Sequence, residues 1–202
     1  RGDVMVFRYP PQPSLDYIKR VIGIPGDEVA YLNKQLTVNG KPVPRTALPE
    51  FFDKDSMRYA QHWRETLDGR SYDTLNDADR PAFVPGATEF PFHDGCRYSV
   101  EGVVCKVPQG HYFMMGDNRD NSIDSRVEQS SGVGMVPAEN LVGKAQIILF
   151  SWKPGASNPS AKCACSSALT SRRSAPRHSA GWAVAAEERF ASAKSVSASF
   201  TI

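Results

Sequence analysis

Lys19 is the first residue whose position suggests chemistry, because it lies within an apolar, strand-like run at residues 15–24. Alternate side chains of a strand share a face, so Tyr17, Lys19 and Val21 would point to the same side. If that side faces inward, partial loss of water lowers the pKa of the amine and makes it a candidate general base. The alternative is a surface lysine whose stem covers apolar surface while its charge stays in water. This segment alone leaves both interpretations open.

A second group of reactive side chains lies in residues 116–126, which read GDNRDNSIDSR. Asp124 and Arg126 are two residues apart, so in an extended stretch they share a side and can form an ion pair. Ser122 would lie on the same side, where its hydroxyl could hydrogen-bond a neighbouring amine. The alternative is a surface turn whose Asp and Asn side chains hydrogen-bond their own backbone.

Metal binding is not expected from this loop or from the cysteines. A calcium loop starting at Asp117 would put the cation Arg119 at its third position, where an oxygen ligand is required. The four cysteines, at positions 96, 105, 163 and 165, lack the spacing of a zinc site. Cys96 and Cys105 could close a short loop through a disulfide, or both could stay reduced.

The charge balance argues against nucleic-acid binding. The chain has 202 residues, with 24 Lys and Arg against 22 Asp and Glu, a net charge of only +2. The surplus is uneven, because residues 1–155 carry 18 basic and 20 acidic residues, whereas residues 156–202 carry 6 and 2. The sequence contains no run of 18 apolar residues, so no membrane span is predicted. The first residues do not resemble a signal peptide.

The elements that must position these residues are predicted to be β-strands. Segments rich in branched and aromatic residues alternate with turns that contain Pro, Gly or Asn. A mainly β, antiparallel barrel or sandwich with few helices is therefore expected. The strands are expected at residues 4–9, 15–24, 29–32, 35–38, 97–107, 111–115 and 141–152.

Two regions differ from this pattern. Residues 45–95 are polar and less periodic, and we expect a small β-rich lobe there with one short helix over residues 56–67. Of the last 47 residues, 12 are Ala and 11 are Ser, a composition that predicts a disordered, low-complexity tail. The expected divisions are residues 1–44, 45–95, 96–153 and 154–202.

Three segments together resemble the sequence boxes of bacterial type I signal peptidase, the membrane-bound serine protease that removes signal peptides. They are residues 1–7, 16–27 and 116–126, and the run YFMMGD at residues 112–117 extends the third. Residues 140–145 (NLVGKA) resemble the strand entry that follows in the family. The resemblance implies a signal-peptidase-like antiparallel β fold, amide hydrolysis by a Ser–Lys dyad, and no metal or other cofactor.

The resemblance implies that Lys19 is the general base that deprotonates the nucleophilic serine. A second serine would hydrogen-bond the lysine amine and orient it, and an ion pair would hold the loop that carries this serine. In the same family, residues 45–95 correspond in position to a variable insertion, and residues 1–44 and 96–153 to the catalytic β core. The residues expected to support the lysine are Ser122, Asp124, Arg126, Arg20 and Gly116.

The implied substrates are exported preproteins, whose signal peptides would bind by strand addition along Asp16, Tyr17 and Ile18. Small pockets there would suit the small residues at a signal-peptide cleavage site. The resemblance also implies a bacterial inner-membrane protein whose catalytic domain faces the periplasm. Disulfides persist in that compartment, so a Cys96–Cys105 bond is favoured there.

The chain departs from the family pattern at both ends. The family's nucleophilic serine and membrane anchor precede the matched segments, so we expect both upstream of Arg1 and expect this chain alone not to cleave preproteins. A shifted reading frame of a GC-rich gene would encode the Ala- and Ser-rich composition of residues 154–202. Two other functions stay open: a non-catalytic, peptide-binding pseudopeptidase and a related Ser–Lys processing protease.

Overall fold

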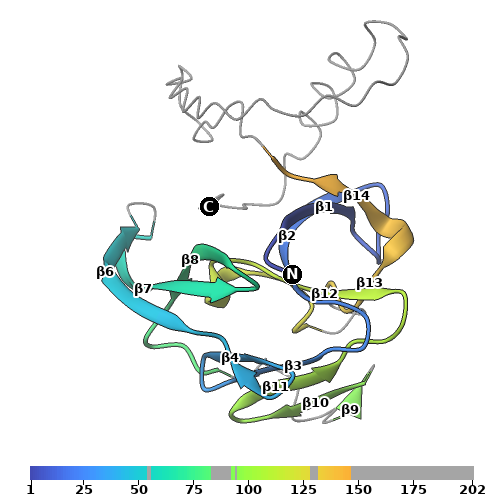
Figure 1. Ribbon diagram of the computed structural model, residues 1–202. Helices are drawn as coiled ribbons and strands as arrows, with labels where there is room; N and C mark the ends of the chain where they lie inside the picture. Colours follow the sequence, from blue (N-terminus) through green and yellow to red (C-terminus); the bar gives the residue numbers. More distant parts are fainter. Residues whose placement is uncertain (54–55, 83–91, 94, 128–131, 147–202) are drawn as a thin grey trace, which may run out of the picture. The chain divides into compact units, whose positions relative to one another are not determined.

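The described residues form β-strands arranged in three antiparallel sheets (Figure 1). The computed structural model describes residues 1–53, 56–82, 92–93, 95–127 and 132–146, and Arg1–Ala145 belong to one compact unit. The helical elements of this part are two short 3-10 helices, η1 (Arg119–Asn121) and η2 (Ala138–Asn140). The mainly β, antiparallel architecture predicted from the sequence is therefore confirmed.

The strand that contains Lys19, predicted at residues 15–24, lies at the centre of the first sheet. Its order is β13-β12-β2-β1-β14. β2 is paired with β1 from Asp16 to Arg20, and with β12 from Arg20 to Gly23. The strands of this sheet are β1 (Val4–Arg8), β2 (Asp16–Gly23), β12 (His111–Met115), β13 (Val136–Pro137) and β14 (Leu141–Lys144).

The second sheet joins the strands predicted at residues 29–32 and 35–38 in a hairpin. Asn33 and Lys34 join β3 to β4 and both adopt positive φ, 47° and 62°, as a two-residue hairpin turn requires. The strand-forming segment predicted over residues 97–107 is divided by a turn into two strands, across which Cys96 and Cys105 are disulfide-bonded. The sheet order is β5-β4-β3-β11-β10-β9. Its strands are β3 (Glu28–Leu32), β4 (Gln35–Val38), β5 (Lys41–Pro42), β9 (Phe92–His93), β10 (Cys96–Ser99) and β11 (Gly102–Lys106).

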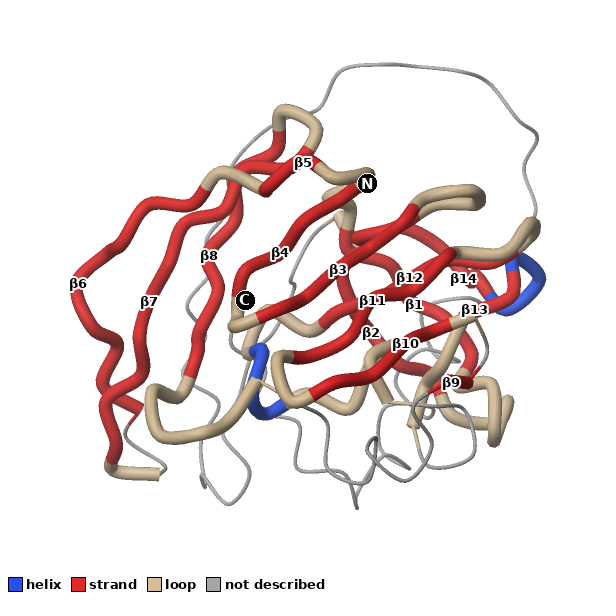
Figure 2. The backbone as a smooth tube through the Cα atoms, turned by 90° about the horizontal axis from the view of Figure 1, so that it is seen from below, coloured by secondary structure: helices blue, strands red, loops and turns tan. Residues whose placement is uncertain are grey.

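The third sheet shows that the helix predicted over residues 56–67 is wrong. Figure 2 shows its three strands side by side, in the order β6-β7-β8. β7 pairs with a neighbour on each edge, and its side chains alternate, with Glu65 and Leu67 buried and Arg64 exposed. The charged residues along β7 hid this period of two, and strand pairing outweighed local preference. The strands are β6 (Arg45–Asp53), β7 (Arg58–Leu67) and β8 (Arg70–Asn76).

The first sheet buries apolar side chains on both of its faces. Ile22 belongs to the larger core cluster, which also includes Tyr31 and Phe113. Val21, the preceding residue on β2, belongs to a smaller cluster against which Tyr17 packs. The alternation expected for β2 is therefore observed, with Tyr17 and Val21 on the same side.

Part of the sequence-based prediction falls outside the described residues. The strand predicted over residues 141–152 ends at Lys144, and its part from residue 147 onward lies outside the described residues, as do the tail predicted over residues 154–202 and Cys163 and Cys165. Within the described part of the chain, none of the helices has the length and apolar character needed to cross a membrane.

Candidate active site

Lys19 lies at the point where β12 separates from the central strand of the first sheet. It is opposite Met5 of β1, and the last pairing with β12 joins Met115 to Arg20, the residue that follows the lysine. β12 then turns into the loop of residues 116–126. The register of the sheet therefore brings the start of this loop beside Lys19.

The environment of Lys19 lowers the pKa of its amine. Its side chain is partly buried, and loss of water on burial is the main cause that lowers the pKa of the amine. Asp124 and Asp117 oppose this shift by favouring the ammonium, and Arg126 adds to it. Lys19 is therefore not a fully exposed surface lysine, and the pKa of its amine lies below the ordinary value of lysine.

Gly116 leaves open the space that Lys19 and Ser122 share. A Cβ on Gly116 would lie 2.2 Å from Ser122 Oγ and 3.5 Å from Lys19 Nζ. Ser122 Oγ is buried and has no hydrogen-bond partner among the described residues. The predicted hydrogen bond between Ser122 and the Lys19 amine is therefore not formed in this structure, although the fold brings both groups to the same point. Because it has no partner, the hydroxyl of Ser122 is free to form a hydrogen bond. Leaving it buried without one is unfavourable.

Asp124 pairs with Arg126 at the end of the loop and also contacts its start. Arg126 Nη2 lies 2.8 Å from Asp124 Oδ2, and Arg126 Nε donates to Oδ1 at 2.9 Å. Asp124 also accepts a hydrogen bond of 3.0 Å from the backbone N–H of Gly116. Burial alone would raise the pKa of Asp124, but the cation and these hydrogen bonds outweigh it and hold the pKa below its ordinary value. The carboxylate therefore stays charged and fixes the loop.

Ser125 fastens the returning end of the loop to β12. Its backbone N–H donates to the carbonyl of Met114 at 3.0 Å, and its hydroxyl accepts from the Met114 N–H at 2.9 Å. The loop therefore folds back along the strand from which it came, which keeps Ser122 close to Gly116.

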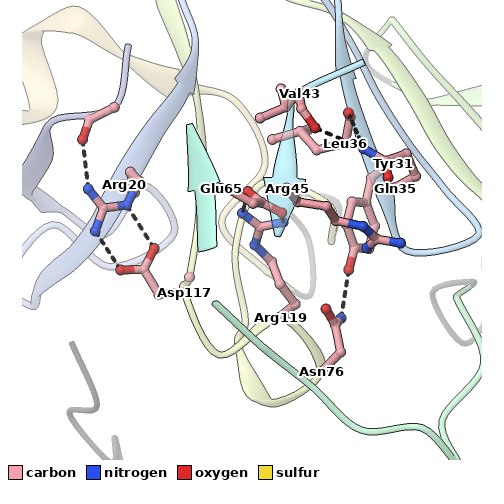
Figure 3. A network of polar contacts seen from close by, with 12 residues as sticks. Arg20, Tyr31, Gln35, Leu36, Val43, Arg45, Glu65, Asn76, Asp117 and Arg119 are labelled. Atoms are coloured by element: carbon pink, nitrogen blue, oxygen red, sulfur yellow. Dashed lines mark hydrogen bonds and ion pairs between the residues drawn. The ribbon is translucent and has the colours of Figure 1, made fainter. Parts of the chain in front are cut away.

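Arg20 joins the loop to the start of the chain. Its guanidinium makes a two-bond ion pair with Asp117, at 2.8 and 2.6 Å, and donates to the carbonyl of Gly2 at 2.7 Å (Figure 3). It also lies over the ring of Tyr72 in β8, 4.0 Å from the centroid. Arg20 therefore ties three separate segments together next to Lys19.

Sequence reasoning also missed a buried ion pair at this site. Arg119, in the loop, pairs with Glu65 of β7 at 2.6 and 3.0 Å, and both side chains are buried. The two residues are 54 positions apart. Glu65 lies in the segment, residues 56–67, where a helix is predicted from the sequence. A charged residue at a buried position of a strand carries no local signal, so only the pairing of β7 reveals it.

The three predicted substrate-binding residues lie along β2, immediately before Lys19. Asp16, Tyr17 and Ile18 pair with β1 on one edge of the strand. Since β12 pairs only from Arg20 onward, the other edge of these residues has no strand partner among the described residues. The ring of Tyr17 stacks on Tyr9, with centroids 4.4 Å apart. This free edge lies next to the lysine.

The Cys96–Cys105 disulfide lies in a different sheet from the candidate site. Among the residues whose placement is given, no group of three His, Cys, Asp or Glu side chains could hold a metal ion. The Cys96–Cys105 disulfide belongs to the second sheet, whereas Lys19 lies in the first. The groups that the described residues bring together at the site are a partly buried amine, a buried hydroxyl and a charged loop.

The chain is similar in sequence to known proteins. Residues 1–152 match a family model described as signal peptidase, peptidase S26. The chain is 42% identical over 158 residues to a signal peptidase I of Pseudomonas fluorescens, which covers 75% of this chain and 49% of that protein. It is 42% identical over 154 residues to a signal peptidase I of Rickettsia typhi, which covers 76% of this chain and 53% of that protein. The chain spans about half the length of these curated relatives.

A solved structure is also similar to this chain. The crystal structure of a signal peptidase I from Enterococcus faecalis V583 is 25% identical, with a TM-score of 0.38. The similarity covers 72% of this chain and 95% of that one.

Proposed function

The chain belongs to the signal peptidase family, peptidase S26, and we propose that it supplies the general base of a serine endopeptidase that cleaves signal peptides from exported preproteins. The observation that carries this proposal is the position of Lys19. Its partly buried amine, with a lowered pKa, borders the same point as the unpartnered hydroxyl of Ser122. A neutral lysine beside a hydroxyl is the arrangement that a Ser–Lys dyad needs.

In the proposed reaction, the neutral amine of Lys19 removes the proton of a nucleophilic serine as the serine oxygen attacks the scissile carbonyl. The ammonium so formed gives this proton to the leaving amine, and an acyl-enzyme results. The same amine then removes a proton from the water that hydrolyses the acyl-enzyme. We propose that this nucleophile lies upstream of Arg1, as the resemblance of residues 1–7 and 116–126 to the family's sequence boxes implies.

Ser122 would hold the amine of Lys19 during these proton transfers. Its hydroxyl can accept a hydrogen bond from the amine, which directs the nitrogen lone pair toward the nucleophile. The Asp124–Arg126 ion pair would keep the backbone of Gly116, and therefore the shared space, in place. In this role the three residues position the base without exchanging protons with the substrate.

The substrate would bind as an added strand at the free edge of Asp16, Tyr17 and Ile18. Backbone hydrogen bonds at this edge would hold an extended peptide in register, and side-chain pockets would select small residues. Because β12 separates from β2 at Arg20, a peptide at this edge runs past Lys19. Such substrates are cleaved at the membrane, so we place the domain at the periplasmic face of the bacterial inner membrane.

The proposal is tested with a chimera in which residues 1–152 replace the aligned segment of the Pseudomonas fluorescens relative. We expect the chimera to cleave a preprotein, and Lys19→Ala to abolish cleavage. Lys41→Ala is the matched control, because Lys41 is exposed on β5 of the second sheet. Gel electrophoresis of a radiolabelled preprotein follows the reaction.

Two outcomes would replace the proposal. A folded chimera that binds the signal peptide but does not cleave it would indicate a pseudopeptidase. Cleavage that persists in the Lys19→Ala chimera would show that another group is the base. The isolated chain is expected not to cleave preproteins, and turnover by it that Lys19→Ala abolishes would show that it contains its own nucleophile.

A further inference from the structure

The third sheet is joined to the loop that carries Ser122 by a buried ion pair. Glu65 on β7 and Arg119 in the loop are each 2% exposed, and two nitrogens of the arginine bind the two carboxylate oxygens (Figure 3). A buried cation without its counter-charge is strongly unfavourable. The position of Arg119 is therefore set by the third sheet, not by the loop itself.

A continuous set of contacts leads from Arg119 to the candidate active site. Its backbone carbonyl accepts a hydrogen bond from Arg126, which is paired with Asp124. Asp124 in turn accepts from the N–H of Gly116, the residue that leaves space for Ser122 and Lys19. Arg119 also begins η1, and Ser122 follows the end of that helix directly. A shift of Arg119 would thus displace the Lys19–Ser122 pair in two ways, through the contacts that lead to Gly116 and through η1, which leads to Ser122.

Other contacts also join the loop to β8 and to the residue that follows β8. The N–H of Leu75 donates to the carbonyl of Asp117 at 2.9 Å. The side chain of Asn76 and the N–H of Asp77 both donate to the carboxylate of Asp120, at 3.2 and 2.7 Å. These contacts hold the loop near the sheet, whereas the Glu65–Arg119 pair is the one that continues through Arg126 and Asp124.

From this geometry we infer that Glu65 is a positioning residue for the Lys19–Ser122 pair and acts through Arg119. The inference rests on the proposed function, because it assigns Glu65 a role in keeping the proposed base buried. Loosening of the loop would admit water around Lys19, whose charged neighbours are Asp117, Asp124 and Arg126. The ammonium form would then be favoured, and the fraction of neutral base at a given pH would fall.

The first test needs no catalysis and uses the chain itself. Glu65→Gln keeps the shape of the side chain and removes its charge. We expect the pKa of Lys19 to rise toward the ordinary lysine value in this variant, measured by NMR titration of reductively [13C]methylated lysines. Lys19→Arg identifies the signal. The matched control is Asp73→Asn, which removes the carboxylate of an exposed ion pair on the same sheet.

The second test uses the chimera. Glu65→Gln should lower kcat roughly 10- to 100-fold, as expected for misplacement of a catalytic group, with KM nearly unchanged. The acidic limb of the kcat/KM profile should move to higher pH, because a base with a raised pKa loses its proton only at higher pH. A purely structural role would lower the melting temperature and leave this limb in place.

Glu65→Asp guards against a variant that fails to fold. It retains the charge on a shorter side chain, and we expect it to restore most of the kcat and the Lys19 titration. If folded Glu65→Gln and Glu65→Asp both titrate Lys19 as the unchanged chain does, the inference is wrong. If they do so while the chimera still cleaves, the proposed function survives without it. A shift of the Lys19 pKa in an inactive chimera would support positioning and count against the proposed function.

Discussion

Arg64 and Glu65 are neighbours on β7, but their ion pairs lie in different environments. Arg64 pairs with Asp73 at 2.7 Å, and Glu65 pairs with Arg119 at 2.6 Å. The distances are almost equal, so geometry does not separate the pairs. The pairs differ in their exposure to water. The side chains of Arg64 and Asp73 are 53% and 34% exposed, whereas those of Arg119 and Glu65 are 1% and 3% exposed. An exposed pair is screened and contributes little, whereas separating a buried pair leaves an uncompensated charge.

The comparison extends from these two pairs to two classes of charged residue. The buried carboxylates accept several hydrogen bonds: Glu65 connects β7 to Arg119, 54 positions away, and Asp124 connects Arg126 to Gly116 at the start of the loop. The exposed carboxylate of Asp73 connects β8 only to its neighbouring strand β7. We therefore expect the effect of removing a carboxylate to follow its burial and not its distance to the nearest cation.

The largest effect is expected at Asp124, which is fully buried. Asp124→Asn leaves Arg126 as a buried cation without a counter-charge and weakens the bond to the Gly116 N–H. The free energy of unfolding should fall by about 3–5 kcal/mol. Urea unfolding of the chain at pH 7 measures this change. A decrease no larger than that caused by Asp73→Asn would break the distinction between buried and exposed pairs.

A smaller loss of stability is expected at Gly116, where the buried network meets the reacting groups. The added methyl group of Gly116→Ala would overlap Ser122 Oγ, so the loop must move, at a cost of about 1–3 kcal/mol. In the chimera this variant should lose most of its activity, measured as kcat. The control is Gly143→Ala on β14, where a Cβ would meet no atom within 4 Å. Equal losses in both variants would contradict the proposed role of the shared space.

Acid should reduce the contribution of a buried carboxylate to the stability of the fold, and Asp27 is an example. Burial alone would raise the pKa of Asp27, but hydrogen bonds from Arg1, the Ile24 N–H and Asn39 outweigh it and lower the pKa to about 2. The unfolded value is about 3.9. The ionised carboxylate therefore stabilises the fold above about pH 4, and this contribution is lost as the pH falls toward 2.

The corresponding measurement compares the melting temperatures of the unchanged chain and of Asp27→Asn from pH 7 down to pH 2.5. The difference should be largest at pH 7 and should shrink on acidification. A difference that is constant over this range would mean that the carboxylate charge is not what stabilises the turn.

The sequence predicted those parts of the site that depend on neighbours in the chain. Lys19 was placed on a strand by an alternating pattern, and Asp124 and Arg126 were paired by their spacing; the structure shows both. The hairpin at Asn33 and Lys34 follows from local turn preferences in the same way.

The third sheet could not be predicted in this way. β7 carries charged residues on both of its faces, so its apolar pattern is weak, and a helix was expected instead. The contact between Glu65 and Arg119 depends on a pairing across 54 residues. Local propensities contain no information about such a contact, and burial of a charge runs against the preference of its residue type.

The smallest effect is expected for the exposed pair, and it gives the comparison its sharpest form. A double-mutant cycle with Arg64→Gln and Asp73→Asn should yield a coupling close to the error of urea unfolding, and 1 M NaCl should remove what remains, because the screening length is then only about 3 Å. The equivalent cycle with Glu65→Gln and Arg119→Gln should yield a large coupling that salt hardly changes, since neither ion is exposed to solvent. Because Arg64 and Glu65 are adjacent on one strand, the two cycles share the same fold and nearly the same backbone. Any difference between the two coupling energies therefore reflects the difference in burial. Equal coupling energies would show that burial does not change the strength of an ion pair on β7.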